Sequence, residues 1–424
     1  MPFTPPEVTL RSIYQLFPAL AHRAFFYFII GQTISMLGLW MQRLAMSWLV
    51  FRLTQSAFLL SIVEFVSLAP LLVFGLMAGA WLERHDLRKA LITTQMLCMF
   101  EAVLLTVSTF SGIAGYPLLV ALSLGLGIIS SFDMTARQSS VSLMVSDQAA
   151  VKSAVALNSM AFNISKLVGP SIAGFVIYFW GEGICFLISS ITYVPIICML
   201  HFRVRLRERV ASHEKKSMFG DIVEGIRHVQ SEFFLNHICR LLAVFCTFSM
   251  CYSVLFPMFS TNVLNGGSQT LGWLFGSVGA GAFVGGVVVS VRLVLRHVPT
   301  FVVRTTTITT IALLVFSFSS NIFISLVAAF FIGYGITATN ISVNTLCQTT
   351  SSDDCRSRVL SLYIMLTSGL GPVGGLAFGA LADIMGAPYT MIFCASVIAL
   401  AILLFLRHFR AIRHSLSQTL AHLS

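Results

Sequence analysis

Charged side chains are scarce in this sequence of 424 residues. Asp, Glu, Lys and Arg together make up 10% of it, whereas hydrophobic residues make up 57%. Soluble domains carry roughly 25% charged residues, because their surfaces must be solvated. A chain of this length with so few charges cannot cover a water-exposed surface. The composition therefore excludes a soluble fold and predicts a membrane protein.

Catalytic signatures are also missing. The sequence holds no HExxH zinc motif, no GxSxG nucleophile motif and no GxxxxGK phosphate loop. These absences argue against an integral membrane enzyme and against direct ATP coupling. The nine cysteines include no CxxC pair and mostly lie in apolar runs, so we interpret them as small buried hydrophobes. We expect no catalytic residue, no metal and no cofactor.

Other classes of protein and partner are disfavoured by the pattern along the chain. A channel needs a repeated filter segment around one axis, and a receptor or scaffold usually adds a soluble module. The sequence offers neither. The net charge of +10 does not indicate nucleic acid, because the basic residues lie in loops beside apolar segments. We expect a lipid bilayer around the protein and no nucleic-acid partner.

Long apolar segments are abundant. A bilayer core about 30 Å thick requires roughly 20 apolar residues of helix, and segments of that length occur about twelve times. We predict an all-α membrane protein with twelve transmembrane helices in two pseudo-symmetric six-helix bundles. The predicted spans are Ala24–Phe51, Ala57–Leu82, Ala90–Phe110, Tyr116–Met134, Val155–Phe179, Ile184–Leu200, Ile238–Thr261, Leu271–Val291, Phe301–Phe318, Ile322–Thr345, Val359–Ile384 and Tyr389–Leu406.

Lysine and arginine gather in every second gap between these spans, with 23 of the 26 on one side. The positive-inside rule then places both termini in the cytoplasm. The longest polar segment separates the first six spans from the last six. The predicted organisation is an amphipathic segment (1–23), an N-terminal bundle (24–200), a cytoplasmic linker (201–237), a C-terminal bundle (238–406) and a cytoplasmic tail (407–424).

The two halves of the chain echo each other weakly. Gly169-Pro170 interrupts the fifth span, and Gly371-Pro372 interrupts the eleventh at an equivalent point. This recurrence favours duplication, as in transporters whose two repeats rock around a site near the bilayer midplane. A run of glycines in the eighth span predicts close helix packing. These glycines are Gly276, Gly279, Gly281, Gly285 and Gly286.

Several motifs carry a resemblance to a known family. The segment from Gly79 to Lys89 resembles the loop signature between spans two and three of the major facilitator superfamily, with Glu83 in place of the usual aspartate. Further segments are similar to the transmembrane secretion effector branch of that superfamily, which includes the enterobactin exporter. These segments are Trp40 to Val50, Phe132 to Gln138, Ala156 to Pro170 and Arg358 to Tyr363.

This resemblance implies alternating-access transport of a small organic molecule in a bacterial cytoplasmic membrane, often efflux driven by the proton gradient, by a monomer. Thr135 stands where the family usually has proline, and Ser47 stands where many relatives carry an acid before Trp48. If that acid normally handles the proton, this chain must use another residue or lack coupling.

Charged residues inside the predicted spans are the first candidates for function. A charge in hydrocarbon costs several kcal/mol unless it is paired or faces a wet cavity. Arg43, Glu64, Glu101 and Lys166 are such residues. Glu64 and Glu101 are candidate proton carriers, and Arg43 is a candidate anchor for an anionic substrate. The structural alternative is that Glu64 pairs permanently with Arg43 or Lys166 and locks helices together.

Amides in the spans and charges in one loop complete the candidate set. The amides offer hydrogen bonds to a ligand or, more commonly, bridge neighbouring helices; they are Asn158, Asn163, Asn340 and Asn344. The loop charges predict a conformational latch that bridges the lobes in one state of the cycle, or serve topology alone. The predicted latch residues are Gly79, Glu83, Arg84, Asp86, Arg88 and Lys89, with Asp133 and Arg137 as local partners.

Secondary transport is the function that the sequence favours. We expect proton-coupled export of a small amphiphilic compound, of siderophore or drug type. Siderophore uptake and lysolipid translocation remain alternatives, because related architectures run in either direction.

Overall fold

The computed structural model describes residues 17–82, 84–145, 147–204, 227, 229–230, 232–351 and 353–423. Across these residues the chain is helical and contains no strand. The predicted latch residue Glu83 lies outside the described residues, as do most of the predicted N-terminal segment and most of the linker.

Two groups of helices follow one another along the chain. The first group is η1 (Pro18–Ala21), α2 (Arg23–Thr54), α3 (Ala57–Leu82), α4 (Leu87–Phe110), α5 (Tyr116–Val141), η2 (Ser142–Met144) and α6 (Gln148–Phe202). The second group is α8 (Phe233–Ser249), α9 (Cys251–Asn262), α10 (Ser268–Arg292), η3 (Leu295–His297), α11 (Val298–Phe318), α12 (Ile322–Thr350), α13 (Asp353–Ile364), η4 (Met365–Gly369), α14 (Leu370–Met385), α15 (Ala387–Arg407) and α16 (Phe409–Leu423).

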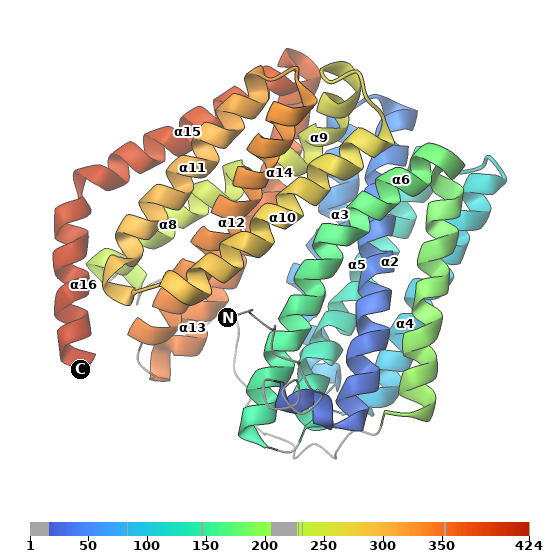
Figure 1. Cartoon of the computed structure of the whole chain (residues 1–424), viewed down its shortest axis with the longest axis horizontal. Coiled ribbons are helices and arrows are strands. Elements are labelled where there is room, and N and C mark those ends of the chain that lie inside the picture. The colour runs from blue at the N-terminus through green and yellow to red at the C-terminus, as the bar shows by residue number, and fades with distance from the viewer. Residues whose placement is uncertain are drawn as a thin grey trace, which may run out of the picture.

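These helices account for the predicted twelve spans. Among the described residues, ten continuous helical segments are long and apolar enough to cross a membrane. One of them, α6, has 55 residues and would be about 80 Å long if straight, far more than a bilayer core. It reverses direction at Gly181, whose φ of 80° suits glycine, and so supplies two spans (Figure 1).

The twelfth span is α3, whose 26 residues match the predicted length. Helices α8 and α9 together form one span, and α13, the π-helical turn η4 and α14 form another. The prediction of an all-α fold with twelve crossings is confirmed within the described residues. The exact boundaries between lobes, linker and tail stay a prediction.

Figure 1 shows the helices gathered into two bundles, here called the N-lobe (α2 to α6) and the C-lobe (α8 to α15). The lobes approach each other at the end where α3 begins and α14 ends, and they diverge toward the end where α3 ends and α13 begins. The main contacts between lobes join α6 to α10 and α3 to α14.

Glycines bring the lobes together along α6 and α10. A Cβ on Gly174 of α6 would lie 2.7 Å from the Cα of Gly272 of α10. A Cβ on Gly279 would lie 2.5 Å from the Cα of Leu167. Real Cβ atoms do not come so close to backbone, so only glycine fits at these points. The close packing predicted for the glycines of the eighth span is therefore found, and part of it forms the contact between the lobes.

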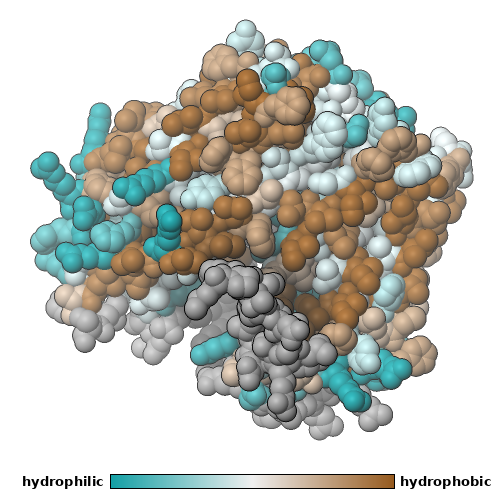
Figure 2. Space-filling model, viewed as in Figure 1, coloured by the Kyte–Doolittle hydropathy of each residue, from teal (hydrophilic) through white to brown (hydrophobic). Residues whose placement is uncertain are grey.

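The outer surface is apolar, as a lipid-facing surface must be. Figure 2 shows hydrophobic side chains over much of the visible face of both lobes. Large side chains such as Phe175, Phe179 and Trp180 are more than half or nearly half exposed. In water such a surface would aggregate, whereas in a bilayer acyl chains cover it.

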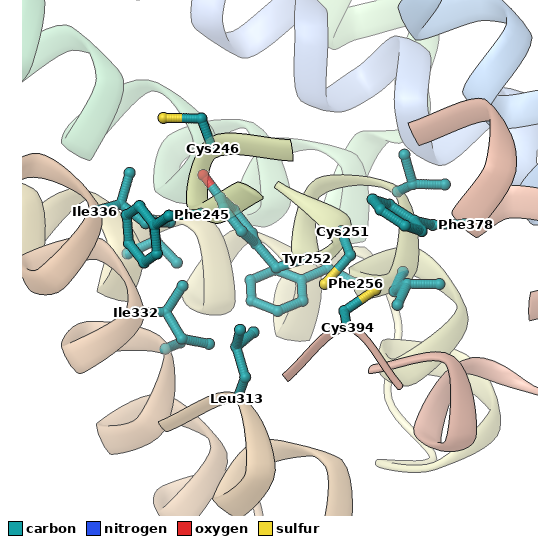
Figure 3. Packing of buried hydrophobic residues seen from close by; sticks show 14 of the residues in the cluster. Phe245, Cys246, Cys251, Tyr252, Phe256, Leu313, Ile332, Ile336, Phe378 and Cys394 are labelled. Carbon is teal, nitrogen blue, oxygen red and sulfur yellow. The ribbon is translucent and has the colours of Figure 1, made fainter. Parts of the chain in front are cut away.

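The C-lobe encloses an apolar core of aromatic and sulfur-containing side chains. Phe256 stacks on Phe316 with ring centroids 4.9 Å apart. Cys251 and Cys394 lie side by side in this core (Figure 3). Seven of the nine cysteines are buried, in agreement with their interpretation as small hydrophobes, and Cys198 is exposed.

Candidate functional site

A cavity of about 250 Å³ lies between the two lobes. Its wall is formed by α2, α3, α5 and α6 on one side and by α9 and α10 on the other, with Met250 between α8 and α9. The lining residues are Trp40, Gln42, Arg43, Leu44, Met46, Ser47, Leu60, Val63, Glu64, Ser67, Leu68, Ser123, Leu126, Ser130, Lys166, Pro170, Met250, Tyr252, Ser253, Phe275 and Val278. Most of this wall is apolar, and a few polar groups converge in it, as in small-molecule sites generally.

Glu64 of α3 reaches across the cavity to the opposite lobe. The hydroxyl of Ser253 in α9 donates a hydrogen bond to Glu64 Oε2 at 3.1 Å. Since α3 belongs to the N-lobe and α9 to the C-lobe, this bond exists only while the lobes hold their present arrangement. The carboxyl group of Glu64 therefore lines the cavity and joins the two lobes.

Arg43 and Lys166 supply the positive charges of the cavity. The Arg43 guanidinium carbon lies 5.2 Å from the ring centroid of Trp40, and Lys166 Nζ lies 5.7 Å from the same ring. Within the part of the chain that the structure describes, neither cation has a carboxylate oxygen within 4.0 Å. The permanent ion pair between Glu64 and one of these cations, considered from the sequence, is not present in this conformation.

Glu101 of α4 does not line the cavity but lies behind one of its lining residues, Gln42, inside the N-lobe. Its Oε2 accepts a hydrogen bond of 2.5 Å from Nε2 of Gln42, which lines the cavity. The amide oxygen of Gln42 in turn accepts a hydrogen bond from Ser189 Oγ at 3.1 Å. Oε1 of Glu101 is buried and has no hydrogen-bond partner among the described residues. Glu101 therefore connects to the cavity through Gln42.

The four predicted amides are not gathered at the cavity. Asn163 donates to the carbonyl of Ser159 within α6, at 2.8 Å, and the buried Oδ1 of Asn158 has no hydrogen-bond partner in the described part of the structure. Asn340 and Asn344 lie on α12. The carbonyl of Asn340 accepts a hydrogen bond from the Tyr363 hydroxyl at 2.9 Å, which ties α12 to α13.

The described loop charges make contacts within the N-lobe. Asp86 is the N-cap of α4 and accepts hydrogen bonds from the backbone N–H groups of Arg88 at 2.9 Å and Lys89 at 3.2 Å. The Arg88 guanidinium donates to the carbonyl of Leu200 at 2.7 Å and also to that of His201, at the end of α6. Arg84 is exposed. A Cβ added at Gly79 would meet no atom of the described residues within 4 Å.

Asp133 and Arg137, predicted as local partners of this loop, pair with each other instead. Arg137 Nε lies 2.5 Å from Asp133 Oδ2, and both side chains are buried in the N-lobe. Asp133 also accepts hydrogen bonds from Thr94 at 2.8 Å and from Gln95 at 2.7 Å, both in α4. The ion pair lies within α5, and the hydrogen bonds from Thr94 and Gln95 to Asp133 hold α4 against α5.

Reasoning from charge alone missed the residues that the C-lobe contributes. Tyr252, Ser253 and Phe275 lie in apolar runs and carry no charge, so their sequence gives no sign that they face a cavity. Gln42 was part of a motif, and its place beside Trp40 and Arg43 was the available signal. No group of three or more His, Cys, Asp or Glu among the described residues is placed to hold a metal ion.

Two helical lobes around a central cavity with a few converging polar groups, and an apolar outer surface, define a multi-pass membrane carrier. Residues 15–422 match the transmembrane secretion effector family. The chain belongs to this family of the major facilitator superfamily, and the resemblance found in its motifs is confirmed. It is therefore a membrane transporter of small molecules.

Proteins similar in sequence include transporters with different roles. The chain is 27% identical over 369 residues to the "Staphyloferrin A transporter" of Staphylococcus aureus, covering 85% of this chain and 90% of the relative. It is 28% identical over 367 residues to the "Multidrug efflux pump Tap" of Mycolicibacterium fortuitum, covering 81% and 85%. It is 22% identical over 383 residues to "Macrolide efflux protein A" of Streptococcus pyogenes, covering 87% and 93%.

Solved structures share the fold at low sequence identity. One is a bacterial homologue of the human lysosomal transporter Spinster in an inward-facing, unoccupied conformation, with a TM-score of 0.66, 13% identity and coverage of 93% of this chain and 97% of that one. Another is a bacterial homologue of the iron transporter ferroportin in an inward-facing state, with a TM-score of 0.66, 14% identity and coverage of 92% and 98%.

Proposed function

We propose that this chain exports a small amphiphilic organic compound, of siderophore or drug type, across the bacterial cytoplasmic membrane by proton-coupled alternating access. The observation that carries the proposal is the hydrogen bond of 3.1 Å between Glu64 and Ser253, which joins the two lobes inside the cavity. Substrate and proton then act on the same contact between lobes. The family and the names of two relatives as efflux proteins support export.

The orientation of the proposed carrier follows from its charges. Among the described residues, Arg84, Arg88 and Lys89 lie between or at the ends of α3 and α4, and Arg292 and Arg296 lie between or at the ends of α10 and α11. The positive-inside rule assigns this end of the helices, with both termini, to the cytoplasm. The described conformation is then open toward the cytoplasm, ready to receive a compound for export. A single chain encloses the cavity, so a monomer suffices for the proposed cycle.

Glu64 is the proposed proton carrier. An ionised carboxylate in a membrane interior is costly unless it is hydrated or paired, so its protonation lowers the cost of closing the cavity around it. Loss of the proton favours a state in which water or a hydroxyl solvates the carboxylate. Glu101, linked to the cavity through Gln42, is the second candidate for this role.

Arg43 and Lys166 are the proposed anchors for the compound. Neither is neutralised by a carboxylate of the described residues, so both remain available to an anionic or carbonyl-rich group. The apolar wall, with Phe275 and Met250 from the opposite side, accommodates the rest of an amphiphile. For the predicted amides we propose helix-bridging roles, which the contact of Asn340 supports, because its Oδ1 accepts a hydrogen bond of 3.4 Å from Cys246 Sγ of α8.

The test compares gradient-driven transport in inverted vesicles by the unaltered chain and by Glu64→Gln. Inverted vesicles whose lumen respiration has acidified should accumulate the transported compound in exchange for protons that leave the lumen, and an uncoupler should abolish this accumulation. Glu64→Gln should lose accumulation while inserting normally. Glu182→Gln is the matched control, because Glu182 pairs with the half-exposed Arg52 and does not line the cavity.

The compounds for this assay come from a thermal-stabilisation screen of the purified protein with siderophores, drug-like amphiphiles and lysolipids, since a bound ligand raises stability by mass action. Arg43→Leu should abolish the rise in unfolding temperature that a binding compound causes in the unaltered protein. Undiminished gradient-driven transport by Glu64→Gln would refute the assignment of the proton site. If the compound accumulated in intact cells and not in inverted vesicles, the direction of transport would be uptake and not export.

A further inference from the structure

The lobes are joined at their closed end by one carboxylate, Asp383, near the end of α14. Its Oδ1 accepts a hydrogen bond of 2.7 Å from the backbone N–H of Ala57, and its Oδ2 accepts one of 3.2 Å from the N–H of Phe58. The Ser56 hydroxyl also donates to Oδ2. Ala57 and Phe58 are the first residues of α3, so an acid of the C-lobe caps a helix of the N-lobe.

The first turn of α3 divides its hydrogen bonds between the two lobes. The N–H groups of Leu59 and Leu60 are satisfied within the N-lobe, by the hydroxyl and the carbonyl of Ser56 respectively. Those of Ala57 and Phe58 are satisfied by Asp383. A helix N-terminus favours a negative charge because its free N–H groups point outward. Half of the cap of α3 therefore depends on the opposite lobe.

The neighbouring packing holds this carboxylate in place. A Cβ on Gly379, one turn before Asp383, would lie 2.6 Å from the carbonyl oxygen of Ala57 and 2.9 Å from Ser61 Cβ. The glycine thus lets α14 lie directly against the first turn of α3. Gly386, with φ of 86°, ends α14 directly afterwards.

The contact is also reversible. Asp383 and Phe58 are exposed, so water can take the place of the carboxylate when the lobes separate. Separation then leaves no buried polar group without a partner, and α3 keeps the part of its cap that Ser56 supplies. A contact of this kind can form and break once in every transport cycle.

We propose that Asp383 is a gating residue that holds the outer end of the carrier closed by capping α3 from the opposite lobe. The contact exists only in the conformation open to the cytoplasm and therefore stabilises that conformation relative to the outward-open one. Asp383 acts on the balance between conformations and touches no substrate. This inference rests on the proposed alternating-access function and adds the residue that sets its resting state.

The test measures how readily the cavity is reached from outside. Ser67 lines the cavity on α3, and Ser67→Cys in a chain with Cys198 and Cys355 replaced by Ser provides a reporter thiol. Intact cells are treated with a membrane-impermeant maleimide. Asp383→Ala should raise the labelling rate by about threefold to tenfold, as expected for loss of one charged helix cap. The labelling rate of Asp383→Asn, which keeps one acceptor oxygen, should lie between the rates of Asp383→Ala and of the reporter chain with Asp383 unaltered.

The matched control is Asp147→Ala. Asp147 caps α6 of its own lobe, accepting from Ala150 N at 2.5 Å, so its loss should not change labelling from outside. A second variant, Ser56→Cys with Asp383→Cys, should stop transport when cross-linked by a short bismaleimide, and no block should follow when either cysteine is alone.

Equal labelling from outside in Asp383→Ala and in the reporter chain would overturn the proposal. Full transport by the cross-linked double-cysteine chain would overturn it as well. Failure of alternating access itself has a separate signature, because the reporter thiol would then react from only one face of the membrane under all conditions, with or without substrate.

Discussion

The two lobes differ in where they keep their charges. The N-lobe has Arg43, Glu64, Glu101 and Lys166 within its spans, and it buries a further ion pair near one end of α5. In the C-lobe the sequence from 241 to 291 contains no Asp, Glu, Lys or Arg, and the described interior of this lobe is built from aromatic, aliphatic and cysteine side chains together with uncharged Thr and Ser. The fold is repeated, but the chemistry is not.

This difference shows that two lobes of similar fold can supply different chemical groups to one cavity. The N-lobe presents titratable and cationic groups to the cavity, whereas the C-lobe contributes the hydroxyl of Ser253 and the rings of Tyr252 and Phe275. A lobe with an uncharged, close-packed interior is suited to moving as a rigid body. In the proposed function, the lobe with the charges is the one that takes up the proton and anchors the compound.

The largest expected effect concerns the buried ion pair of the N-lobe. Arg137→Leu leaves Asp133 buried without its partner, and loss of one member of a buried pair costs about 3–5 kcal/mol. We expect a marked fall in the thermal unfolding temperature of the purified protein. The Gln32 amide, in the orientation that satisfies both of its ends, also bonds to Arg137 and would lose this contact.

The C-lobe offers the matching control. Thr305 and Thr339 share a buried hydrogen bond of 2.7 Å between α11 and α12. Thr305→Val keeps the shape of the side chain and should cost only about 1 kcal/mol. If Thr305→Val destabilised the protein as much as Arg137→Leu, the contrast between a polar and an apolar lobe would not describe how stability is distributed.

A smaller effect is expected at the loop between α3 and α4, where the sequence predicts a latch. Arg84→Glu should leave insertion and folding intact and reduce transport about tenfold, equivalent to about 1.4 kcal/mol, if Arg84 bridges to the C-lobe when the cytoplasmic end closes. Transport into inverted vesicles measures this change, and the amount of protein in the membrane normalises it.

The equivalent loop of the C-lobe provides the comparison for this variant. Arg296 lies in η3 between α10 and α11, on the same side of the predicted membrane, and is exposed. Arg296→Glu should change transport little. Similar losses in both variants would mean that the loops act only through their topological charge, as the alternative interpretation of the sequence holds.

Much of the fold was predictable from the sequence because bilayer thickness imposes a length on every crossing helix. The spans, the weak repeat and the role of the glycines of α10 followed from apolar length and small-residue patterns. The turn at Gly181 was also signalled, by the polar gap between Phe179 and Ile184. The π-helical turn η4, through which the helix continues into α14, was not predictable, because no residue type in η4 is specific to such a turn.

The site was predictable only in part. Charge in an apolar span identified Arg43, Glu64 and Lys166, which the fold brings to one cavity. Ser253 was missed because its partner lies in the other lobe, 189 residues away along the chain. Asp383 lies at the end of the predicted span Val359–Ile384, where its charge was a signal, but its partner in α3 is 326 residues away. No local pattern encodes a contact that depends on how two separately folded lobes meet.

The smallest effect is expected at the half-exposed ion pair of the N-lobe. Arg52 Nε lies 2.9 Å from Glu182 Oε1, next to the turn at Gly181, and the side chains of Arg52 and Glu182 are 52% and 10% exposed. Pairs at the surface contribute about 0–1 kcal/mol, because water solvates the exposed guanidinium and salt screens the pair. Arg52→Gln should therefore shift the unfolding temperature little, and less at high salt. A loss comparable to that of Arg137→Leu would show that the turn at Gly181, and not the buried pair of Asp133 and Arg137 in α5, limits the stability of this lobe.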